Sequence, residues 1–317
     1  MSIRPAPVST GLVSAGQTDL SILVHRAAER LAAVGIASPR SDAELLAAHA
    51  VGTDRHGLAR DLALGRRLTP AQRLRYAQLL DRRSAREPLQ HLTGQAAFRR
   101  VVLAVGPGVF VPRPETEVVA GAGIEEAVRL VTEGRVPVVV DLGTGSGAIA
   151  AAVADEVPGC VVHAIERDPQ AYGWAVHNLA TTSVQLLQAD LSALPDGWAA
   201  SVDVVVSNPP YVPLGACLRD PEVARYDPPA ALWAGRDGLT AIREVARAAA
   251  RLLRPGGLLV VEHGDQQGAQ VTGLLSGTAD WAAVCDHPDL TGRSRYVTAR
   301  RQGAGGSAGE LVGRAET

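Results

Sequence analysis

The sequence predicts an α/β protein in which a small all-α helical bundle domain precedes a mainly parallel, doubly wound sheet. Two observations predict this fold. Apolar residues recur at helical spacing through residues 19–87, as Leu20, Leu23 and Leu31 illustrate. After residue 138, short runs rich in β-branched residues alternate with helical segments, which is the pattern of βαβ units whose sheet is covered on both faces.

The chain divides into five predicted segments. They are a disordered lead at 1–17, a helical domain at 18–87, a linker with a β-hairpin at 88–114, the sheet domain at 115–301 and a disordered tail at 302–317. The lead is rich in Ser, Pro and Gly and lacks the pattern of a secretory signal, and the tail is rich in Gly and Ala. Neither composition suits a packed core.

Two helix starts are predicted within the helical domain. They are Ser41-Asp42-Ala43-Glu44 and Thr69-Pro70-Ala71-Gln72, each with a hydroxyl side chain three residues before Glu or Gln, which is the spacing of a capping box. Pro70 suits the first helical position because its missing N–H would have no partner there. The prediction is a bundle of about four helices.

The linker is predicted to contain a β-hairpin. Its two strands are 100–105 and 109–111, both rich in β-branched residues, and Gly106-Pro107-Gly108 separates them with turn-forming residues. This hairpin would connect the helical domain to the sheet domain.

The elements of the sheet domain are predicted from the change of period along the chain. A helix at 117–132 comes first. We then predict strands at 138–141, 160–166, 184–188, 202–206, 258–262 and around 295–299, and helices at 147–155, 169–180 and 239–253.

Composition excludes several classes of protein. The longest apolar runs, such as 138–140, have the length of strands and fall far short of the roughly 20 residues of a membrane span. Cys160, Cys217 and Cys285 are odd in number and widely spaced, which supports neither a disulfide framework nor a metal site. We therefore expect a cytoplasmic protein without a metal.

Charge is divided unevenly along the chain. Residues 1–100 carry 15 Arg against 8 acidic residues, the rest carries 16 Arg against 25 acidic residues, and the sequence has no Lys. The basic half is either a surface that faces nucleic acid or the ribosome or a set of solvated helix faces, and we favour the latter. The absence of Lys excludes a Gly-x-x-x-x-Gly-Lys phosphate loop, and the eight His residues show no His-Glu-x-x-His spacing.

A glycine-rich turn follows the first predicted strand of the sheet. It is the segment Asp141-Leu142-Gly143-Thr144-Gly145-Ser146-Gly147, called the glycine turn below. Glycines at such a turn let the backbone approach a ligand closely. Taken alone, the glycine turn also fits a loose dinucleotide fingerprint or a turn without a ligand.

Polar residues end or follow four of the predicted strands, at Asp141, Glu166, Asp190 and Asn208. Because the carboxyl ends of parallel strands line the ligand crevice of an open sheet, we expect these side chains to meet there. Asp141 would orient the turn or accept from an amino group. Glu166 would accept from two ribose hydroxyls, and Asp190 would accept from the exocyclic amine of adenine.

The segment Asn208-Pro209-Pro210-Tyr211, called the reaction segment below, indicates which reaction the site would support. Two prolines cannot donate backbone hydrogen bonds, so the segment leaves the sheet and points bare carbonyls into the crevice. The Asn208 amide oxygen and the Pro209 carbonyl would accept both hydrogens of a planar NH₂, while Tyr211 packs on its flat face. This arrangement suits methylation of an amide or amine nitrogen. Positioning of the reacting groups can lower the activation barrier by about 7 to 11 kcal/mol, so no general base is needed.

These residues resemble those of the release-factor glutamine N5-methyltransferases, over about residues 20–300. The resemblance is carried, in order, by Glu87-Pro88 with His91-Leu92-Thr93-Gly94, Phe98, Val111-Pro112-Arg113-Pro114-Glu115-Thr116-Glu117, the glycine turn, the reaction segment, Asp237-Gly238-Leu239 and Asp289-Leu290-Thr291-Gly292-Arg293. The stretch from Pro112 to Glu117 separates this family from general methyltransferases. The resemblance implies a Rossmann-like class I methyltransferase domain with a mainly parallel seven-stranded sheet.

The resemblance also implies S-adenosyl-L-methionine as the cofactor, with S-adenosyl-L-homocysteine as the product and no metal. Together with the strand ends, it gives as predicted cofactor-binding residues Asp141, Gly143, Thr144, Gly145, Ser146, Gly147, Glu166, Asp190, Leu191 and Asn208. The predicted substrate-binding residues are Asn208, Pro209, Pro210 and Tyr211, of which Asn208, Pro209 and Tyr211 are the predicted catalytic residues.

The implied substrate is the glutamine of the Gly-Gly-Gln motif of class 1 peptide chain release factors, methylated on N5, so that the activity modulates translation termination. The helical domain would then be a substrate-recognition domain that adds contacts to the release factor. No membrane association and no direct nucleic-acid binding are expected, and the chain is expected to be a monomer.

Three residues depart from the family pattern. Glu166 stands where Asp is commoner, Asp227 stands where Glu is expected, and His263 stands where many members carry an aliphatic residue. The first two keep the carboxylate. His263 is interpreted as structural rather than catalytic, and its effect on the packing of its strand stays open.

Three alternative functions stay open. A methyltransferase of a ribosomal-protein glutamine would use the same site with a different recognition domain. An adenine-N6 methyltransferase would need a basic channel for nucleic acid, whereas the catalytic half of this chain is acidic. A catalytically silent binding module would have no need of Asn208 or the glycine turn.

Overall fold

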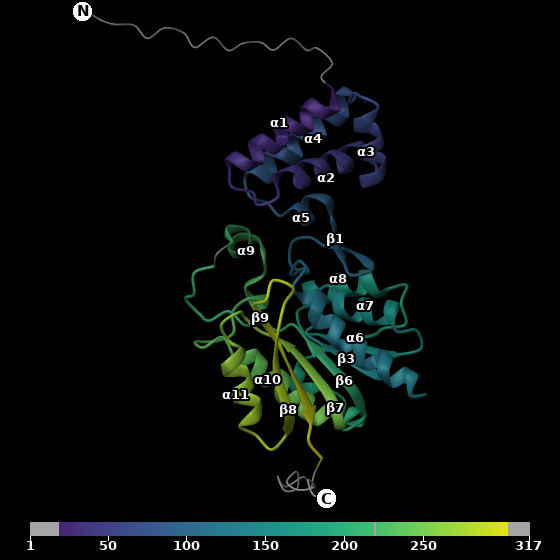
Figure 1. Ribbon diagram of the computed structural model, residues 1–317, viewed down its shortest axis with the longest axis vertical. Helices are drawn as coiled ribbons and strands as arrows, with labels where there is room; N and C mark the ends of the chain where they lie inside the picture. The colour runs from purple at the N-terminus through teal and green to yellow at the C-terminus, as the bar shows by residue number, and fades with distance from the viewer. Residues whose placement is uncertain (1–18, 219, 304–317) are drawn as a thin grey trace, which may run out of the picture. The chain divides into compact units, whose positions relative to one another are not determined.

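The computed structural model describes residues 19–218 and 220–303 (Figure 1). The chain divides into two compact units, Met1–Thr93 and Gly94–Thr317. Each unit has a hydrophobic core of its own. The predicted lead at 1–17 lies outside the described residues, as does the predicted tail except for Gln302 and Gly303.

The first unit is helical, as predicted. Its described residues form α1 (Leu20–Ala33), α2 (Pro39–Val51), α3 (Arg55–Ala63), α4 (Pro70–Ser84) and the short α5 (Leu89–Thr93). The apolar stripe of α1 faces the core of the bundle, where Leu20 and Leu31 are fully buried. The helical period of the sequence therefore comes from burial of one face of each helix.

The two predicted helix starts have different outcomes. α4 begins with the predicted capping box, in which the Thr69 hydroxyl accepts from the Gln72 amide nitrogen at 3.2 Å and the Gln72 side chain accepts from the Thr69 nitrogen at 3.1 Å. The start predicted at Ser41 is wrong, because α2 begins at Pro39. The fixed φ of proline and its missing N–H suit the first helical position, so the helix begins at Pro39, with Ser38 as the cap, three residues earlier than predicted.

The second unit begins with a β-hairpin that lies closer to the N-terminus than predicted. β1 (Gln95–Phe98) and β2 (Val101–Ala104) pair antiparallel, with Phe98 opposite Val101. The chain therefore turns between these strands, and the predicted hairpin of 100–105 with 109–111 is wrong, since residues 109–111 form no strand.

Gly106 and Gly108, from which a turn was predicted, allow close packing instead. A side-chain carbon at Gly106 would lie 2.8 Å from the Trp174 ring, and one at Gly108, where φ is +91°, would lie 2.8 Å from the side chain of Gln170. Both Trp174 and Gln170 belong to α8 (Pro169–Leu179). Gly106 and Gly108 thus let the connecting chain run against a helix, a role that sequence pattern alone does not distinguish from a turn.

A mainly parallel seven-stranded sheet forms the centre of the second unit, which confirms the predicted fold class. Its spatial order is β5-β4-β3-β6-β7-β9-β8, and only the pairings of β9 with β7 and β8 are antiparallel. The strands are β3 (Val138–Leu142), β4 (Val161–Glu166), β5 (Gln185–Gln188), β6 (Val202–Ser207), β7 (Leu253–Glu262), β8 (Trp281–Pro288) and β9 (Ser294–Arg301). β7 begins five residues before the prediction, and β8 was not predicted individually.

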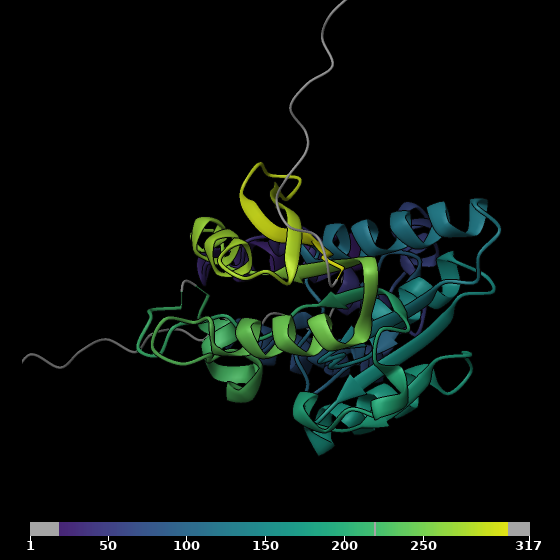
Figure 2. The same cartoon turned by 90° about the horizontal axis from the view of Figure 1, so that it is seen from below.

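Helices cover both faces of this sheet (Figure 2). One core joins α6, α7 and α8 to alternate strand residues such as Val204 and Val206, and the other joins α10 and α11 to Val205. This alternation follows from the period of two in a strand. The helices of the second unit other than α8 are α6 (Thr116–Thr132), α7 (Ala148–Glu156), α9 (Pro221–Tyr226), α10 (Thr240–Leu252) and α11 (Gly268–Ser276).

The strand register brings the polar strand ends together. β6 and β7 run parallel with Ser207 opposite Val261, so Asn208 and Glu262 follow at the same edge of the sheet. In the part of the chain that the structure describes, no helix combines the length and the apolar character that crossing a membrane requires.

Candidate active site

A cavity of about 970 Å³ lies in the second unit, where the loops after β3, β4, β6 and β7 meet. Its volume is at the upper end of the roughly 300 to 1,000 Å³ of small-molecule sites, so it has room for a cofactor and a substrate side chain. Asp141, Gly147 and Asp190 do not belong to its lining. The predicted site residues that do line it are Gly143, Thr144, Gly145, Ser146, Glu166, Leu191, Asn208, Pro209, Pro210 and Tyr211.

The glycine turn presents bare backbone to this cavity. Gly143 and Gly145 have φ values of +74° and +58°, which side chains rarely tolerate, and a side-chain carbon at either position would meet no atom within 4 Å. Gly147 also has a positive φ, but there a side-chain carbon would lie 3.1 Å from Leu179 of α8. The first two glycines therefore leave space for a ligand, which fits the implied cofactor, while Gly147 serves packing.

Asp141 organises the glycine turn from behind the cavity. Its Oδ2 accepts from the Thr144 hydroxyl and from the Ala150 amide nitrogen, the latter at 3.1 Å, so it ties the turn to the start of α7. Its Oδ1 is buried without a hydrogen-bond partner in 19–218 and 220–303. Burial raises the pKa of Asp141 to about 7. Of the two predicted roles, orientation of the turn is the one its contacts support.

Glu166 is fixed at the end of β4 by two backbone donors. Its Oε2 accepts from the Gly145 nitrogen at 2.9 Å and its Oε1 accepts from the Asp168 nitrogen at 2.8 Å. A carboxylate has about four acceptor sites, so two remain for the hydroxyls of a ligand. The position of Glu166 in the lining fits the predicted ribose role.

We expect Glu166→Ala to weaken S-adenosylmethionine binding by about 10- to 100-fold, because hydrogen bonds to a charged group contribute about 1.5 to 3 kcal/mol. Isothermal titration calorimetry on the full chain measures the dissociation constant. The matched variant is Asp190→Ala, for which a change of less than about threefold is expected because Asp190 lies outside the lining. Equal dissociation constants for wild type and Glu166→Ala would exclude the ribose role.

The contacts of Asp190 differ from those predicted for an adenine acceptor. Its Oδ1 accepts from the Ser192 nitrogen at 3.0 Å and from the Ser192 hydroxyl at 2.7 Å, and this hydrogen bonding holds its pKa below the usual value. It therefore caps the short helix Leu191–Ala193. Its neighbours Ala189 and Leu191 line the cavity instead.

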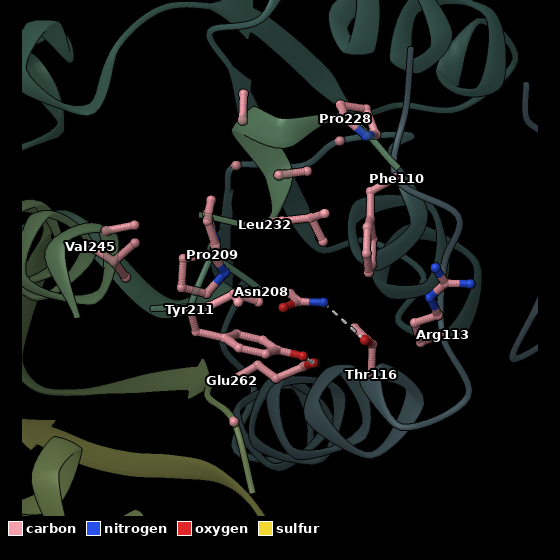
Figure 3. Close-up of a pocket in the computed structure, with 18 of the residues that line it drawn as sticks. Phe110, Arg113, Thr116, Asn208, Pro209, Tyr211, Pro228, Leu232, Val245 and Glu262 are labelled. Atoms are coloured by element: carbon pink, nitrogen blue, oxygen red, sulfur yellow. Dashed lines mark hydrogen bonds between the residues drawn. The ribbon is translucent and has the colours of Figure 1, made fainter. Parts of the chain in front are cut away.

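The reaction segment leaves the sheet after β6, as predicted. The Asn208 Nδ2 donates to the Thr116 hydroxyl at 3.0 Å, and the Tyr211 hydroxyl donates to Glu262 Oε1 at 3.2 Å (Figure 3). The Tyr211 carbonyl accepts from Gln267 Nε2 at 3.0 Å. Both ends of the segment are thus anchored to other elements of the second unit.

An aromatic and a charged side chain form another part of the cavity wall. The Arg113 guanidinium lies 4.9 Å from the centroid of the Phe110 ring, and Arg113 forms an ion pair with the buried Asp227. This pair links the stretch from Pro112 to Glu117 to the loop that follows α9. Asp227 thus keeps a partner for its carboxylate even though the family pattern has Glu there. Figure 3 shows Phe110 and Arg113 across from Asn208.

Thr116 and Glu262 line the cavity but were absent from the predicted site residues. Both are buried. A signal was present for each, since Thr116 belongs to the family-specific stretch and Glu262 is an acid at the end of a parallel strand. Their joint contact with the reaction segment is a property of the folded chain.

His263 lies outside the cavity lining. It is fully buried, with Nε2 3.0 Å from Asp286 Oδ1 of β8 and Nδ1 2.9 Å from the Gly264 carbonyl. The ring therefore joins the segment just after β7 to β8, a contact that fits the structural interpretation. In the described residues, no group of three or more His, Cys, Asp or Glu side chains could hold a metal ion.

Known proteins match the chain in both units. Residues 23–94 match a family model described as the PrmC N-terminal domain, and residues 126–217 match one described as the methyltransferase small domain. A release factor glutamine methyltransferase of Streptomyces coelicolor is 49% identical over 282 residues, which cover 88% of this chain and 96% of that protein. The chain belongs to the release factor glutamine methyltransferase family.

Other relatives match at similar coverage. A release factor glutamine methyltransferase of Mycolicibacterium smegmatis is 44% identical over 292 residues, 90% of this chain and 98% of that protein. A 4-amino-L-phenylalanine/4-methylamino-L-phenylalanine methyltransferase of Streptomyces pristinaespiralis is 39% identical over 280 residues, 87% of this chain and 94% of that protein. The chain is a methyltransferase of the class I α/β fold, and this family and fold imply S-adenosylmethionine as the methyl donor.

Proposed function

We propose that this enzyme transfers the methyl group of S-adenosyl-L-methionine to N5 of the glutamine in the Gly-Gly-Gln motif of class 1 peptide chain release factors, and so modulates translation termination. Family membership supports the reaction. The observation that carries the proposal is the anchored amide of Asn208, whose Nδ2 is held by Thr116 while the residue lines a cavity large enough for a glutamine side chain.

The reaction segment suits a glutamine amide because it offers acceptors to a planar NH₂. The Asn208 Oδ1 and the Pro209 carbonyl would each accept one hydrogen, and the Tyr211 ring would cover the flat face of the amide. A carboxamide nitrogen is a weak nucleophile, since its electron pair is delocalised. Catalysis would therefore come mainly from alignment with the reactive methyl group, which contributes up to about 7 to 11 kcal/mol.

Bound S-adenosylmethionine supplies an electrophilic methyl group. The electron pair of the glutamine nitrogen would form the new bond to the methyl carbon, the electrons of the carbon–sulfur bond would remain on sulfur, and one N–H proton would pass to water. The products are N5-methylglutamine and S-adenosyl-L-homocysteine. The residues proposed to hold the cofactor are those of the glycine turn that line the cavity, with Glu166, Leu191 and Asn208.

The substrate-recognition role of residues 18–87 is part of this proposal. The match of residues 23–94 to the PrmC N-terminal domain supports this role, because the region is shared with relatives named release factor glutamine methyltransferases. We also propose that the enzyme acts in the cytoplasm as a monomer, without a metal.

The test is incubation of the full chain with isotopically labelled S-adenosylmethionine and separate acceptors, followed by peptide mapping. The acceptors are a class 1 release factor, the same factor with its Gly-Gly-Gln glutamine changed to alanine, a ribosomal protein fraction, DNA and 4-amino-L-phenylalanine. Label on the Gly-Gly-Gln glutamine of the first acceptor alone is the expected result.

Label on one of the other acceptors would contradict the proposed substrate and indicate a different one. Label on a ribosomal protein or on DNA would favour the alternatives drawn from the sequence. Label on 4-amino-L-phenylalanine would place the chain with the amine methyltransferase relative. The absence of label on every acceptor would contradict the proposed activity.

A further inference from the structure

A turn of residues 289–293, called the β8–β9 turn below, lies at the same edge of the sheet as the cavity. β9 runs antiparallel to β7, with Tyr296 opposite Glu262, so the chain enters β9 at the carboxyl end of β7. The cavity is lined by residues that follow the carboxyl ends of the parallel strands, and Arg293 at the end of the turn belongs to the same lining. The β8–β9 turn is therefore next to the candidate active site.

Asp289 fixes the conformation of the β8–β9 turn. Its side chain is buried, and its Oδ1 accepts from the Thr291 nitrogen at 2.8 Å, from the Thr291 hydroxyl at 2.6 Å and from the Arg293 nitrogen at 3.2 Å. Its Oδ2 accepts from Arg295 Nη2 at 3.3 Å. Gly292 has a φ of +81°, and its nitrogen donates to the Asp289 carbonyl at 2.9 Å. A turn that is already ordered loses little conformational freedom when it binds a partner.

Leu290 projects from this ordered turn into solvent. It is 93% exposed, the highest value among the large hydrophobic residues of 19–218 and 220–303 that are exposed. The hydrogen bonds of the turn are made by Asp289, Thr291 and Gly292, so the turn does not require an apolar residue at position 290. A leucine at this position becomes favourable when its side chain is removed from water by a partner.

Arg293 adds a positive charge to the same turn. The residue is exposed, and its guanidinium group forms no ion pair and no hydrogen bond with the residues that the structure describes. The neighbouring Arg295 differs, because Asp289 binds its side chain. A guanidinium group has five N–H donors that suit carboxylate or carbonyl oxygens. The β8–β9 turn thus presents an apolar and a charged side chain beside the cavity.

We propose that the β8–β9 turn is a docking element for the protein that carries the acceptor glutamine. Leu290 packs into an apolar depression of that protein, and Arg293 binds its carboxylate or carbonyl oxygens. The inference rests on the proposed function, because it requires a protein as the acceptor. A glutamine side chain reaches Asn208 only if the polypeptide that carries it crosses the edge of the cavity, where Arg293 lies. A free amino acid would leave Leu290 without a partner surface.

The first test measures the steady-state kinetics of Leu290→Asp in the full chain, on the protein acceptor that the wild-type enzyme methylates. Loss of a docking contact weakens the ground state and the transition state of the complex equally. KM for the protein acceptor should therefore rise about 10- to 100-fold, while kcat changes by less than about twofold. Leu290→Met keeps an apolar side chain of similar volume and should keep KM within about threefold of wild type.

Val136→Asp is the matched control, because it introduces the same charge at another exposed apolar position. Val136 is 66% exposed and precedes β3, at the opposite end of the strands from the cavity. Its KM and kcat should both remain within about twofold of wild type. Circular dichroism and an unchanged dissociation constant for S-adenosylmethionine show that each variant is folded.

The second test concerns the charge of Arg293. Salt screens exposed charges, so KM of the wild-type enzyme for the protein acceptor should rise between about 0.05 and 0.3 M salt. Arg293→Gln should have a higher KM at low salt, by about 5- to 10-fold, and a weaker dependence on salt. Arg293→Lys keeps the charge and should keep most of the salt dependence. Equal salt dependence in wild type and Arg293→Gln would overturn the role of this charge.

The outcomes separate the docking role from the proposed function. Wild-type KM in Leu290→Asp on the release factor, or an equal rise in Leu290→Asp and Val136→Asp, would overturn the docking role and leave the substrate assignment intact. Label on another protein would overturn the substrate assignment, and a raised KM of Leu290→Asp on that protein would still support docking. Label on 4-amino-L-phenylalanine alone would overturn both.

Discussion

Replacement of Asn208 by alanine is expected to lower kcat for methyl transfer by about 100- to 1,000-fold, similar to the loss of one group that stabilises a transition state in other enzymes. The variant removes the side-chain acceptor that would hold one hydrogen of the substrate NH₂. Calorimetric binding of S-adenosylmethionine should remain measurable, because the glycine turn and Glu166 are untouched. Single-turnover transfer of label to the acceptor measures the chemical step.

Asn208→Asp is the matched variant. It keeps an acceptor oxygen but loses the NH₂ group that donates to Thr116, so the hydrogen bond that holds the wild-type amide in place is lost. We expect a kcat between those of wild type and Asn208→Ala. Full activity of Asn208→Ala would contradict the proposed grip on the substrate.

Replacement of Asp42 by alanine is expected to destabilise the helical bundle of the first unit by about 3 to 5 kcal/mol, because it removes the carboxylate that neutralises the buried Arg83 guanidinium. Asp42 of α2 and Arg83 of α4 are 2.8 Å apart, and their side chains are 9% and 7% exposed. The free energy of unfolding of the full chain is measured by denaturant titration. Hydrogen exchange assigns the loss of protection to α2 and α4.

Two controls accompany this prediction. The double variant Asp42→Leu/Arg83→Met removes both charges and should recover most of the lost stability, since replacing a buried ion pair by apolar groups is often close to neutral. Asp81→Ala breaks the exposed pair of Asp81 with Arg30 and should cost less than about 1 kcal/mol. Equal effects of Asp42→Ala and Asp81→Ala would contradict the importance of burial for this pair.

The relative named as a methyltransferase of an amino-phenylalanine raises the question of how proteins with this site select their acceptor. Amide and aromatic amine nitrogens both present a planar NH₂ group, and the acceptors of the reaction segment fit either. Selection between them would therefore depend on the wall opposite Asn208, where Phe110 and Arg113 lie. The pair of Arg113 with Asp227 holds that wall in place.

The sequence predicted those features that depend on neighbouring residues. The capping box at Thr69, the alternation of strands and helices, the glycine turn and the exit of the reaction segment after Ser207 all appear in the structure. Each is set by local chemistry, such as a hydroxyl near a helix start or the missing N–H of proline. The family was also visible in the sequence, because its motifs are contiguous.

Other features needed the tertiary structure because their partners are distant in the chain. The packing of Gly106 against Trp174 of α8 was not predictable from the sequence, which suggested a turn there. The hydrogen bonds by which Asp190 caps the short helix after it were not predicted either. The contact of Asn208 with Thr116 joins residues 92 positions apart. That of Tyr211 with Glu262 joins residues 51 positions apart.

The sequence by itself thus determined the fold class and the residues of the reaction segment. The tertiary structure decided which atoms of those residues are free to meet a substrate. The physical reason is that a hydrogen bond fixes the orientation of an amide or a hydroxyl only through its partner, and here the partners Thr116 and Glu262 are supplied by a helix and a strand on either side of Asn208 in the sequence.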